Sequence, residues 1–131
     1  MPKWVDQGEN RVARILFGSL SPDSTLYLGL YTNTSEPSET ATLSNINEPT
    51  GGGYSRQALY RGSWSISGSV ATHPRRDFVC TATWGNVYGY FICEVENGTS
   101  GDLLCVEQFS DGPYYVTTDG AVKITSRITV S

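Results

Sequence analysis

Apolar and polar residues alternate with a period of two along much of the chain. Between Thr25 and Tyr31 three leucines occupy every second position, with two tyrosines and a glycine between them. Between Ala121 and Val130 the even positions carry Val and Ile with one Ser, and the odd ones carry Ala, Lys, Thr and Arg. Because a strand turns alternate side chains to opposite faces, both segments are predicted strands. The leucines should face the core and Tyr27 and Tyr31 the opposite face, where their large rings would suit a partner.

Further strand signals recur at intervals of about ten residues, with turn residues between them. They cover Tyr54–Trp64, Ser65–Thr72, Asp77–Thr83, Val87–Glu94, Asp102–Phe109 and Tyr114–Thr117. In the fourth of these runs Tyr88 and Tyr90 share one parity and Val87, Phe91 and Cys93 the other, which predicts a central strand covered on both sides. This many short strands predict an all-β fold, an antiparallel, jelly-roll-like β-sandwich.

One segment has a helical period instead. Val12, Ile15 and Leu16 fall on one face between Asp6 and Phe17, and Gly18 follows as a stop signal. We therefore predict one short N-terminal helix. Since such a helix is marginal alone, its apolar stripe should dock on its own sheet or on a neighbouring subunit.

The predicted domain organisation is an N-terminal arm and helix in residues 1–20, followed by a single β-sandwich domain in residues 21–131. Residues 33–53 are rich in Ser, Thr, Glu and Asn and end in three glycines, which predicts a long loop. Loops of about 20 residues are uncommon unless they carry contacts, so this one is a candidate arm or interface element.

Composition excludes several classes of partner. The net charge is −4, with 9 basic and 13 acidic residues, so the chain has no broad positive field to hold nucleic acid. No segment approaches the ~18 consecutive apolar residues of a membrane span. The three cysteines, Cys80, Cys93 and Cys105, cannot all pair within one chain, and we expect reduced core residues, as in a protein assembled in a reducing cytoplasm.

Catalytic chemistry has little support in the sequence. The single histidine, His73, precedes a proline, and no serine lies in a strained-elbow motif. We expect no catalytic residue, cofactor, metal site or small-molecule substrate. The alternative from a different class is a carbohydrate-active enzyme that uses Glu94, Glu96 and Glu107 as its paired carboxylates.

What remains are surfaces suited to contact with other chains. Trp4 lies near a free end, where an exposed indole usually needs a pocket. The candidate interface residues are Trp4, Ile15, Tyr27, Tyr31, Tyr54, Arg56, Tyr114 and Tyr115. Such contact surfaces, without a catalytic site, favour the interpretation of the chain as a non-enzymatic assembly protein.

Two motifs in a fixed order, Gly-Gly-Tyr-Ser-Arg-Gln at residues 52–57 and Trp-Gly-Asn-Val at residues 84–87, lie between the Leu-Tyr-Leu-Gly-Leu-Tyr strand and the closing strand. This layout resembles small bacteriophage virion proteins of the tail-fibre-like and capsid decoration (cement) type. The resemblance implies a capsid cement protein on the virion surface, with the major capsid protein and sister protomers as partners, in a homo-oligomer such as a trimer. The alternative is a tail or tail-fibre component that touches the host through Ser110–Tyr115.

Overall fold

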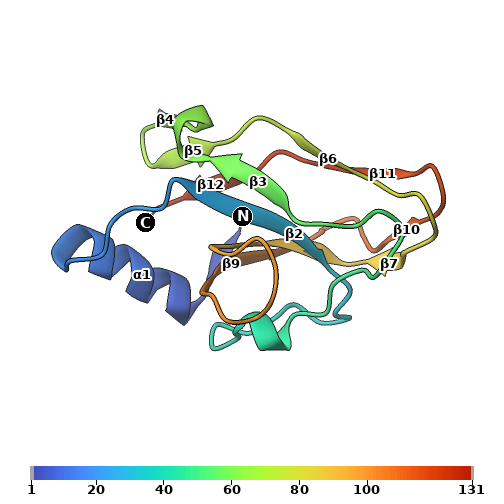
Figure 1. The fold of residues 1–131 in the computed structure, drawn as a ribbon, viewed down its shortest axis with the longest axis horizontal. Coiled ribbons are helices and arrows are strands. Elements are labelled where there is room, and N and C mark those ends of the chain that lie inside the picture. Colours follow the sequence, from blue (N-terminus) through green and yellow to red (C-terminus); the bar gives the residue numbers. More distant parts are fainter. Residues whose placement is uncertain (1, 131) are drawn as a thin grey trace.

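The computed structural model describes residues 2–130 and shows a mostly antiparallel β protein with one N-terminal helix (Figure 1). The largest sheet has five strands in the order β1-β9-β8-β2-β3. The other sheets are β12-β5-β4, β11-β6 and β10-β7. The strands of the large sheet are β1 (Lys3–Trp4), β2 (Thr25–Tyr31), β3 (Gln57–Tyr60), β8 (Gly89–Cys93) and β9 (Leu103–Gln108). The remaining strands are β4 (Ser65–Ser67), β5 (Val70–Thr72), β6 (Arg76–Val79), β7 (Gly85–Val87), β10 (Tyr114–Val116), β11 (Ala121–Ile124) and β12 (Arg127–Thr129).

The large sheet has a hydrophobic core on each face. The first core joins it to the smaller sheets and includes Leu28 and Ile92 from the large sheet and Phe78 and Ile124 from the smaller ones. In Figure 1 strands β4, β5, β6 and β11 lie above the large sheet, and β7 and β10 lie at its right. The second core lies on the opposite face. There Tyr31, Phe91 and Val106 pack against residues of the 33–53 loop, whose buried apolar members are Ala41, Leu43 and Ile46. The sheet is therefore covered on both sides by its own chain.

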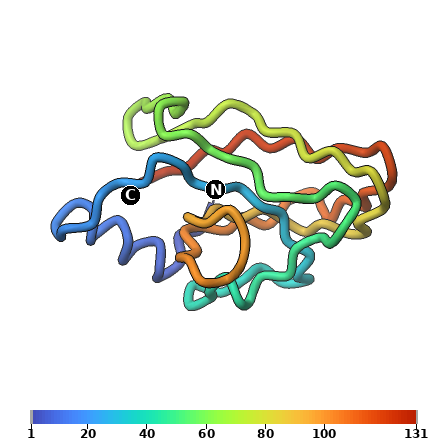
Figure 2. The backbone as a smooth tube through the Cα atoms, viewed as in Figure 1, coloured from blue at the N-terminus to red at the C-terminus, as the bar shows by residue number. Residues whose placement is uncertain are grey.

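The predicted alternation in β2 is confirmed. Leu28 and Leu30 are fully buried in the first core, and Tyr31 lies in the second core with Tyr27 packed beside it. The tyrosine face meets the 33–53 segment, which folds back under the sheet and runs along its lower side in the tube view (Figure 2). That segment has no strand, as predicted, and its only regular element is the 3-10 turn η1 (Leu43–Asn45).

The predicted central strand is also confirmed, because every residue of β8 is buried and the strand lies third in the sheet. Its predicted parity is wrong at the start. Val87 belongs to the first core with Tyr90, whereas Tyr88 packs on the second core with Phe91. The chain leaves β7 at Val87 and enters β8 at Gly89, and this break shifts the alternation by one residue.

The helix α1 (Asp6–Phe17) has its predicted bounds and ends at Gly18, whose N–H donates to Arg14 O. Its buried positions are Gly8 and Arg11, not the predicted apolar stripe. A Cβ on Gly8 would lie 2.2 Å from Leu104 O, so the missing side chain lets the helix backbone approach β9 closely. Two residues of the stripe, Val12 and Ile15, are half-buried, whereas Leu16 is 66% exposed.

Arg11 secures the helix to the rest of the chain. Its guanidinium pairs with Asp23 Oδ1 at 2.7 Å, Glu94 Oε2 at 2.5 Å and Asp102 Oδ2 at 3.0 Å. These carboxylates raise the pKa of Arg11, with the Asp23 hydrogen bond as the largest cause, and Arg11 stays charged at all ordinary pH values. A cation buried at this position is thus matched by three acids from three segments.

Several strand boundaries differ from the prediction. The run Ser65–Thr72 is a hairpin of β4 and β5 and not one strand, because Gly68 takes a positive φ of 60° at its turn. The predicted closing strand is divided into β11 and β12, which pair with β6 and β5, respectively. Strand β1, which the sequence analysis did not find, pairs Lys3 with Val106 and Trp4 with Cys105.

Candidate functional site

An open groove of about 600 Å³ lies between the end of β9, strand β10 and strand β11. Strands β10 and β11 follow each other in sequence, yet they pair with β7 and β6 and not with one another. The groove is lined by residues of both. Its floor is formed by the buried side chains of Tyr90, Val116, Val122 and Ile124.

A row of aromatic rings leads from the floor of this groove to its rim. Tyr90 lies 6.4 Å from Phe109, and Phe109 lies 4.8 Å from Tyr114, measured between ring centroids. Tyr114 is 38% exposed and its neighbour Tyr115, also in the lining, is 66% exposed. The rim therefore offers two aromatic faces to solvent above a buried aromatic base.

Polar groups are placed along this row. Tyr90 and Glu107 are opposite each other in the β8–β9 ladder, and the Tyr90 hydroxyl donates to Glu107 Oε2 at 2.5 Å. Burial, and then the hydrogen bond to Glu107, raises the pKa of Tyr90. The Tyr114 hydroxyl donates to Asp111 Oδ1, and this bond raises the pKa of Tyr114. The other polar lining residues are Gln108, Ser110, Thr117, Lys123 and Thr125.

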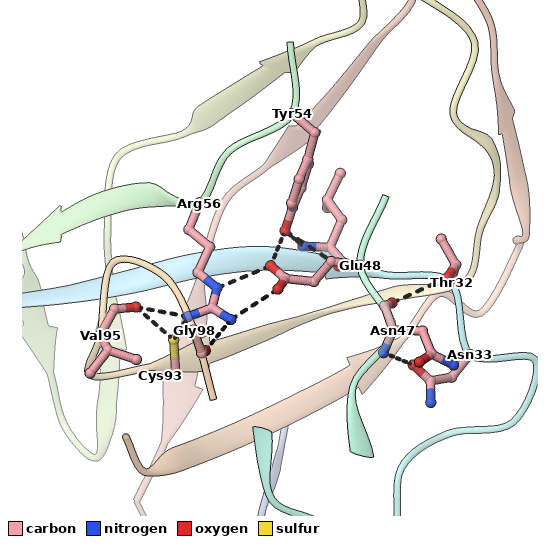
Figure 3. A network of polar contacts seen from close by, with 10 residues as sticks. Thr32, Asn33, Asn47, Glu48, Tyr54, Arg56, Cys93, Val95 and Gly98 are labelled. Carbon is pink, nitrogen blue, oxygen red and sulfur yellow. Dashed lines mark hydrogen bonds and ion pairs between the residues drawn. The ribbon is translucent and has the colours of Figure 1, made fainter. Parts of the chain in front are cut away.

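A second cavity of about 610 Å³ borders a polar network of a different kind (Figure 3). Arg56 binds Glu48 through two parallel contacts, Nε to Oε1 at 3.0 Å and Nη2 to Oε2 at 2.9 Å. It also donates to Val95 O at 3.0 Å and Gly98 O at 2.9 Å. Tyr54 completes the network by donating to Glu48 Oε1 at 2.6 Å.

This network is structural. The Arg56 side chain is only 3% exposed, it lies 5.3 Å from the centre of the Phe91 ring, and its donors all reach acceptors of the chain. Burial, and then the charge of Glu48, raises the pKa of Tyr54. The network fastens the 33–53 segment and the loop after β8 to the edge of the second core.

The predicted interface residues fall into two groups. Most contact their own chain: Tyr31 is fully buried, Tyr27 packs beside it, Tyr54 and Arg56 form the network, and Ile15 is half-buried on α1. The Trp4 indole packs on the first core and donates from Nε1 to Thr129 O at 3.1 Å. The pocket expected for Trp4 is thus provided within the chain. Tyr54 and Arg56 border the second cavity, where they are engaged in the network, and Tyr114 and Tyr115 lie at the groove with exposed side chains.

The carboxylates of the enzymatic alternative are separated. Glu94 pairs with Arg11, Glu96 borders the second cavity, and Glu107 lies in the groove. His73 is buried, accepts from Tyr60 N–H at Nε2 and contacts Pro74 O through Nδ1, so both ring nitrogens bind backbone. Within residues 2–130 no group of His, Cys, Asp and Glu could hold a metal ion.

The cysteine prediction is confirmed, since Cys80, Cys93 and Cys105 are buried and unpaired. Burial raises the pKa of the Cys93 thiol to about 11 and also raises that of Cys105. Cys93 accepts from Arg56 Nη1 at 3.5 Å. It is part of the structural network and not a reactive site.

Residues 4–131 match the family described as podophage GP4 fiber I protein gp80. The chain belongs to this family of phage fibre proteins. No curated protein matches the chain. The family places this fibre protein in the phage virion and supports a structural role. It favours the fibre alternative of the sequence analysis over the capsid cement interpretation. No helix in the described part of the fibre protein is long and apolar enough to cross a membrane.

Most residues of the groove in this fibre protein were not predicted from the sequence. Phe109 and Asp111 are five and three residues before Tyr114, so the density of aromatic and turn residues in the 109–115 segment was a usable signal. Glu107 could be assigned to the groove only through its register opposite Tyr90. Lys123 and Thr125 occupy odd positions of the predicted closing strand, and only the folded structure brings them to the same groove as Tyr114.

Proposed function

We propose that this chain is a non-enzymatic tail-fibre component that contacts the surface of the bacterial host through the groove between β10 and β11. The observation that carries the proposal is the pair of solvent-facing rings, Tyr114 and Tyr115, at the rim of a cavity of about 600 Å³. Exposed aromatic side chains beside a concave surface are typical of binding sites, because they add much apolar contact area with little loss of side-chain entropy.

The fibre family supports this function, since fibres are the part of a virion that extends from the particle. The segment Ser110–Tyr115, the host-contact candidate of the fibre alternative, forms one wall of the groove. Most candidates for capsid contact, in contrast, are engaged within the chain. We therefore assign the groove to the host and not to the capsid.

Sister protomers of the same chain are the second proposed partner, in a homo-oligomeric fibre. Support comes from the end of α1, where Leu16 is 66% and Phe17 is 88% exposed. Two neighbouring apolar side chains of this size gain free energy when another surface covers them.

We also infer a jelly-roll-like sandwich as the architecture of the body. The large sheet faces the smaller sheets across one shared core, and all the strand pairs are antiparallel. This arrangement leaves the groove at the edge where the strands of the smaller sheets diverge.

The test uses the full chain, its Tyr115→Ala variant and living host cells. Labelled wild-type chain should bind the cells and compete with intact phage for adsorption, whereas Tyr115→Ala should do neither. The matched control is Tyr60→Ala, which removes another exposed tyrosine, 52% exposed against 66% for Tyr115, from the edge strand β3. Antibody labelling of whole virions should mark the tail. Labelling over the whole head, with no competition for adsorption, would restore the capsid interpretation.

A further inference from the structure

We infer that the groove binds a neutral oligosaccharide, a ligand class that deepens the proposed function and rests on it. The inference starts from the combination of neighbouring aromatic rings and hydrogen-bonding groups in one open cavity. A volume of about 600 Å³ is within the usual range for a site that holds a small organic ligand.

The aromatic row suits the shape of a sugar ring. A pyranose has a face of C–H groups and an edge of hydroxyls, so it packs one face on an aromatic ring while the edge remains free to form hydrogen bonds. Tyr115 and Tyr114 offer such rings at the rim. Phe109 lies 4.8 Å from Tyr114 and supports it from behind. The Tyr114 ring is therefore held in place before a ligand arrives, which lowers the entropic cost of binding.

The polar lining suits the hydroxyl edge. Asp111 at the rim and Glu107 on the floor present carboxylate oxygens, which accept strong hydrogen bonds from hydroxyl donors. Gln108, Ser110 and Thr125 can both donate and accept, as sugar hydroxyls do. Such a lining matches a polyol better than it matches an apolar ligand or a peptide that requires one defined charge.

The charge of the groove favours a neutral sugar over an acidic one. Among its lining residues Glu107 and Asp111 are acidic and Lys123 is basic, and the whole chain carries a net charge of −4. A uronic acid would approach carboxylates at short range, where like charges repel each other. Neutral hexoses carry no charge to be repelled, and their hydroxyls can form the same hydrogen bonds with the lining.

The first experiment titrates the full chain with tetrasaccharides of glucose, mannose and galactose, and separately with tetragalacturonate. Amide chemical shifts are recorded by NMR. At least one neutral tetrasaccharide should bind saturably and shift amides of β10 and β11, and tetragalacturonate should bind at least tenfold more weakly. Tyr115→Ala should weaken binding tenfold or more. Tyr115→Phe, which keeps the ring, should stay within threefold of wild type, and Tyr60→Ala should leave binding unchanged.

The second experiment measures binding of the labelled chain to host cells pretreated with periodate, which cleaves sugar diols, or with proteinase K. Loss of binding after periodate and retention after proteinase support the saccharide. Retention of binding after periodate with loss after proteinase would overturn the neutral-saccharide ligand and leave the host-contact function intact. Tighter binding of tetragalacturonate than of the neutral sugars would do the same. A chain that binds no untreated cells at all would instead contradict the proposed function itself.

Discussion

Two tyrosine–carboxylate pairs in this protein have nearly the same local geometry and very different surroundings. Tyr54 donates to Glu48 at 2.6 Å, and Tyr90 donates to Glu107 at 2.5 Å. In both pairs burial raises the pKa of the tyrosine. The first pair borders the second cavity of about 610 Å³ but is closed by the buried guanidinium of Arg56, whose other donors reach backbone carbonyls. The second pair lies in the groove of about 600 Å³, which two exposed tyrosines also line.

The difference shows that the residue types of a polar cluster do not reveal its role. A buried carboxylate that is matched by a bidentate guanidinium has its hydrogen-bonding capacity used inside the chain, and it contributes to the fold. A tyrosine–carboxylate pair at the base of a cavity is held in position but faces a space that a ligand can enter. The surroundings of each pair therefore decide between structure and binding, and the following changes test this assignment.

The largest expected effect is that of Arg56→Met, which removes the cation from the closed pair. Glu48 would remain as a mostly buried carboxylate without its guanidinium, which costs about 3–5 kcal/mol of the free energy of unfolding. Urea denaturation measures the loss. The control is Arg75→Met, because Arg75 and Asp77 form an exposed pair 2.9 Å apart, and its loss should cost less than ~1 kcal/mol. Equal effects of the two variants would contradict the structural role of the network.

Alkaline pH should weaken the closed network next. The pKa of Cys93 is raised from 9.0 to about 11 by burial, so the folded state holds the thiol proton more tightly than the unfolded state does. Its contribution is fully present below pH 9 and is lost as pH rises through 11, by roughly 2–3 kcal/mol. The free energy of unfolding of Cys93→Ala should therefore fall less steeply between pH 9 and 11 than that of wild type. If the free energies of unfolding of Cys93→Ala and wild type fall in parallel between pH 9 and 11, Cys93 makes no such contribution.

A smaller difference is expected between Tyr54→Phe and Tyr90→Phe. The first variant removes a donor to Glu48 and the acceptor of the Leu30 N–H, both in the covered network, and should cost about 1–3 kcal/mol. The second removes a donor to Glu107, whose carboxylate borders the open groove where water can replace the hydroxyl, and should cost less than ~1 kcal/mol. Thermal denaturation of the two variants measures both losses. A larger loss of stability in Tyr90→Phe than in Tyr54→Phe would contradict the different roles assigned to the two pairs.

The smallest expected effect on stability is that of Tyr115→Ala. This side chain is 66% exposed at the rim of the groove, so its removal should change the free energy of unfolding by no more than about 0.5 kcal/mol. Denaturant unfolding provides the measurement. A loss of several kcal/mol would mean that the rim residues support the fold and would weaken their assignment to ligand binding.

The elements of the fold were largely predictable because their signals are local. The alternation of leucine and tyrosine in β2 and the end of α1 at Gly18 need only the neighbouring residues. The closest contacts of α1 were not predictable from its apolar stripe, because they are made by a glycine and an arginine, Gly8 against Leu104 and Arg11 with its three carboxylates. The break between β7 and β8 at Tyr88 likewise leaves no mark in the pattern.

The candidate site was predictable only in part. Tyr114 and Tyr115 were recognised from their exposed turn context, but the register that places Glu107 beside Tyr90 depends on pairing between β8 and β9. Arg56 was taken for a surface residue because its partner Glu48 lies in a loop without periodicity. Long-range pairing of polar side chains depends on how loops fold back, and no local pattern records it.

The bond from the Trp4 indole to Thr129 O places the first and last strands of the described chain side by side. A short flexible linker could therefore join residues 2 and 130, and new ends could be opened at an exposed turn such as the one around Gly68. A circularly permuted chain of this kind would keep the β10–β11 edge intact. It would allow the protein to be displayed on a carrier in a second orientation, without altering any residue of the groove.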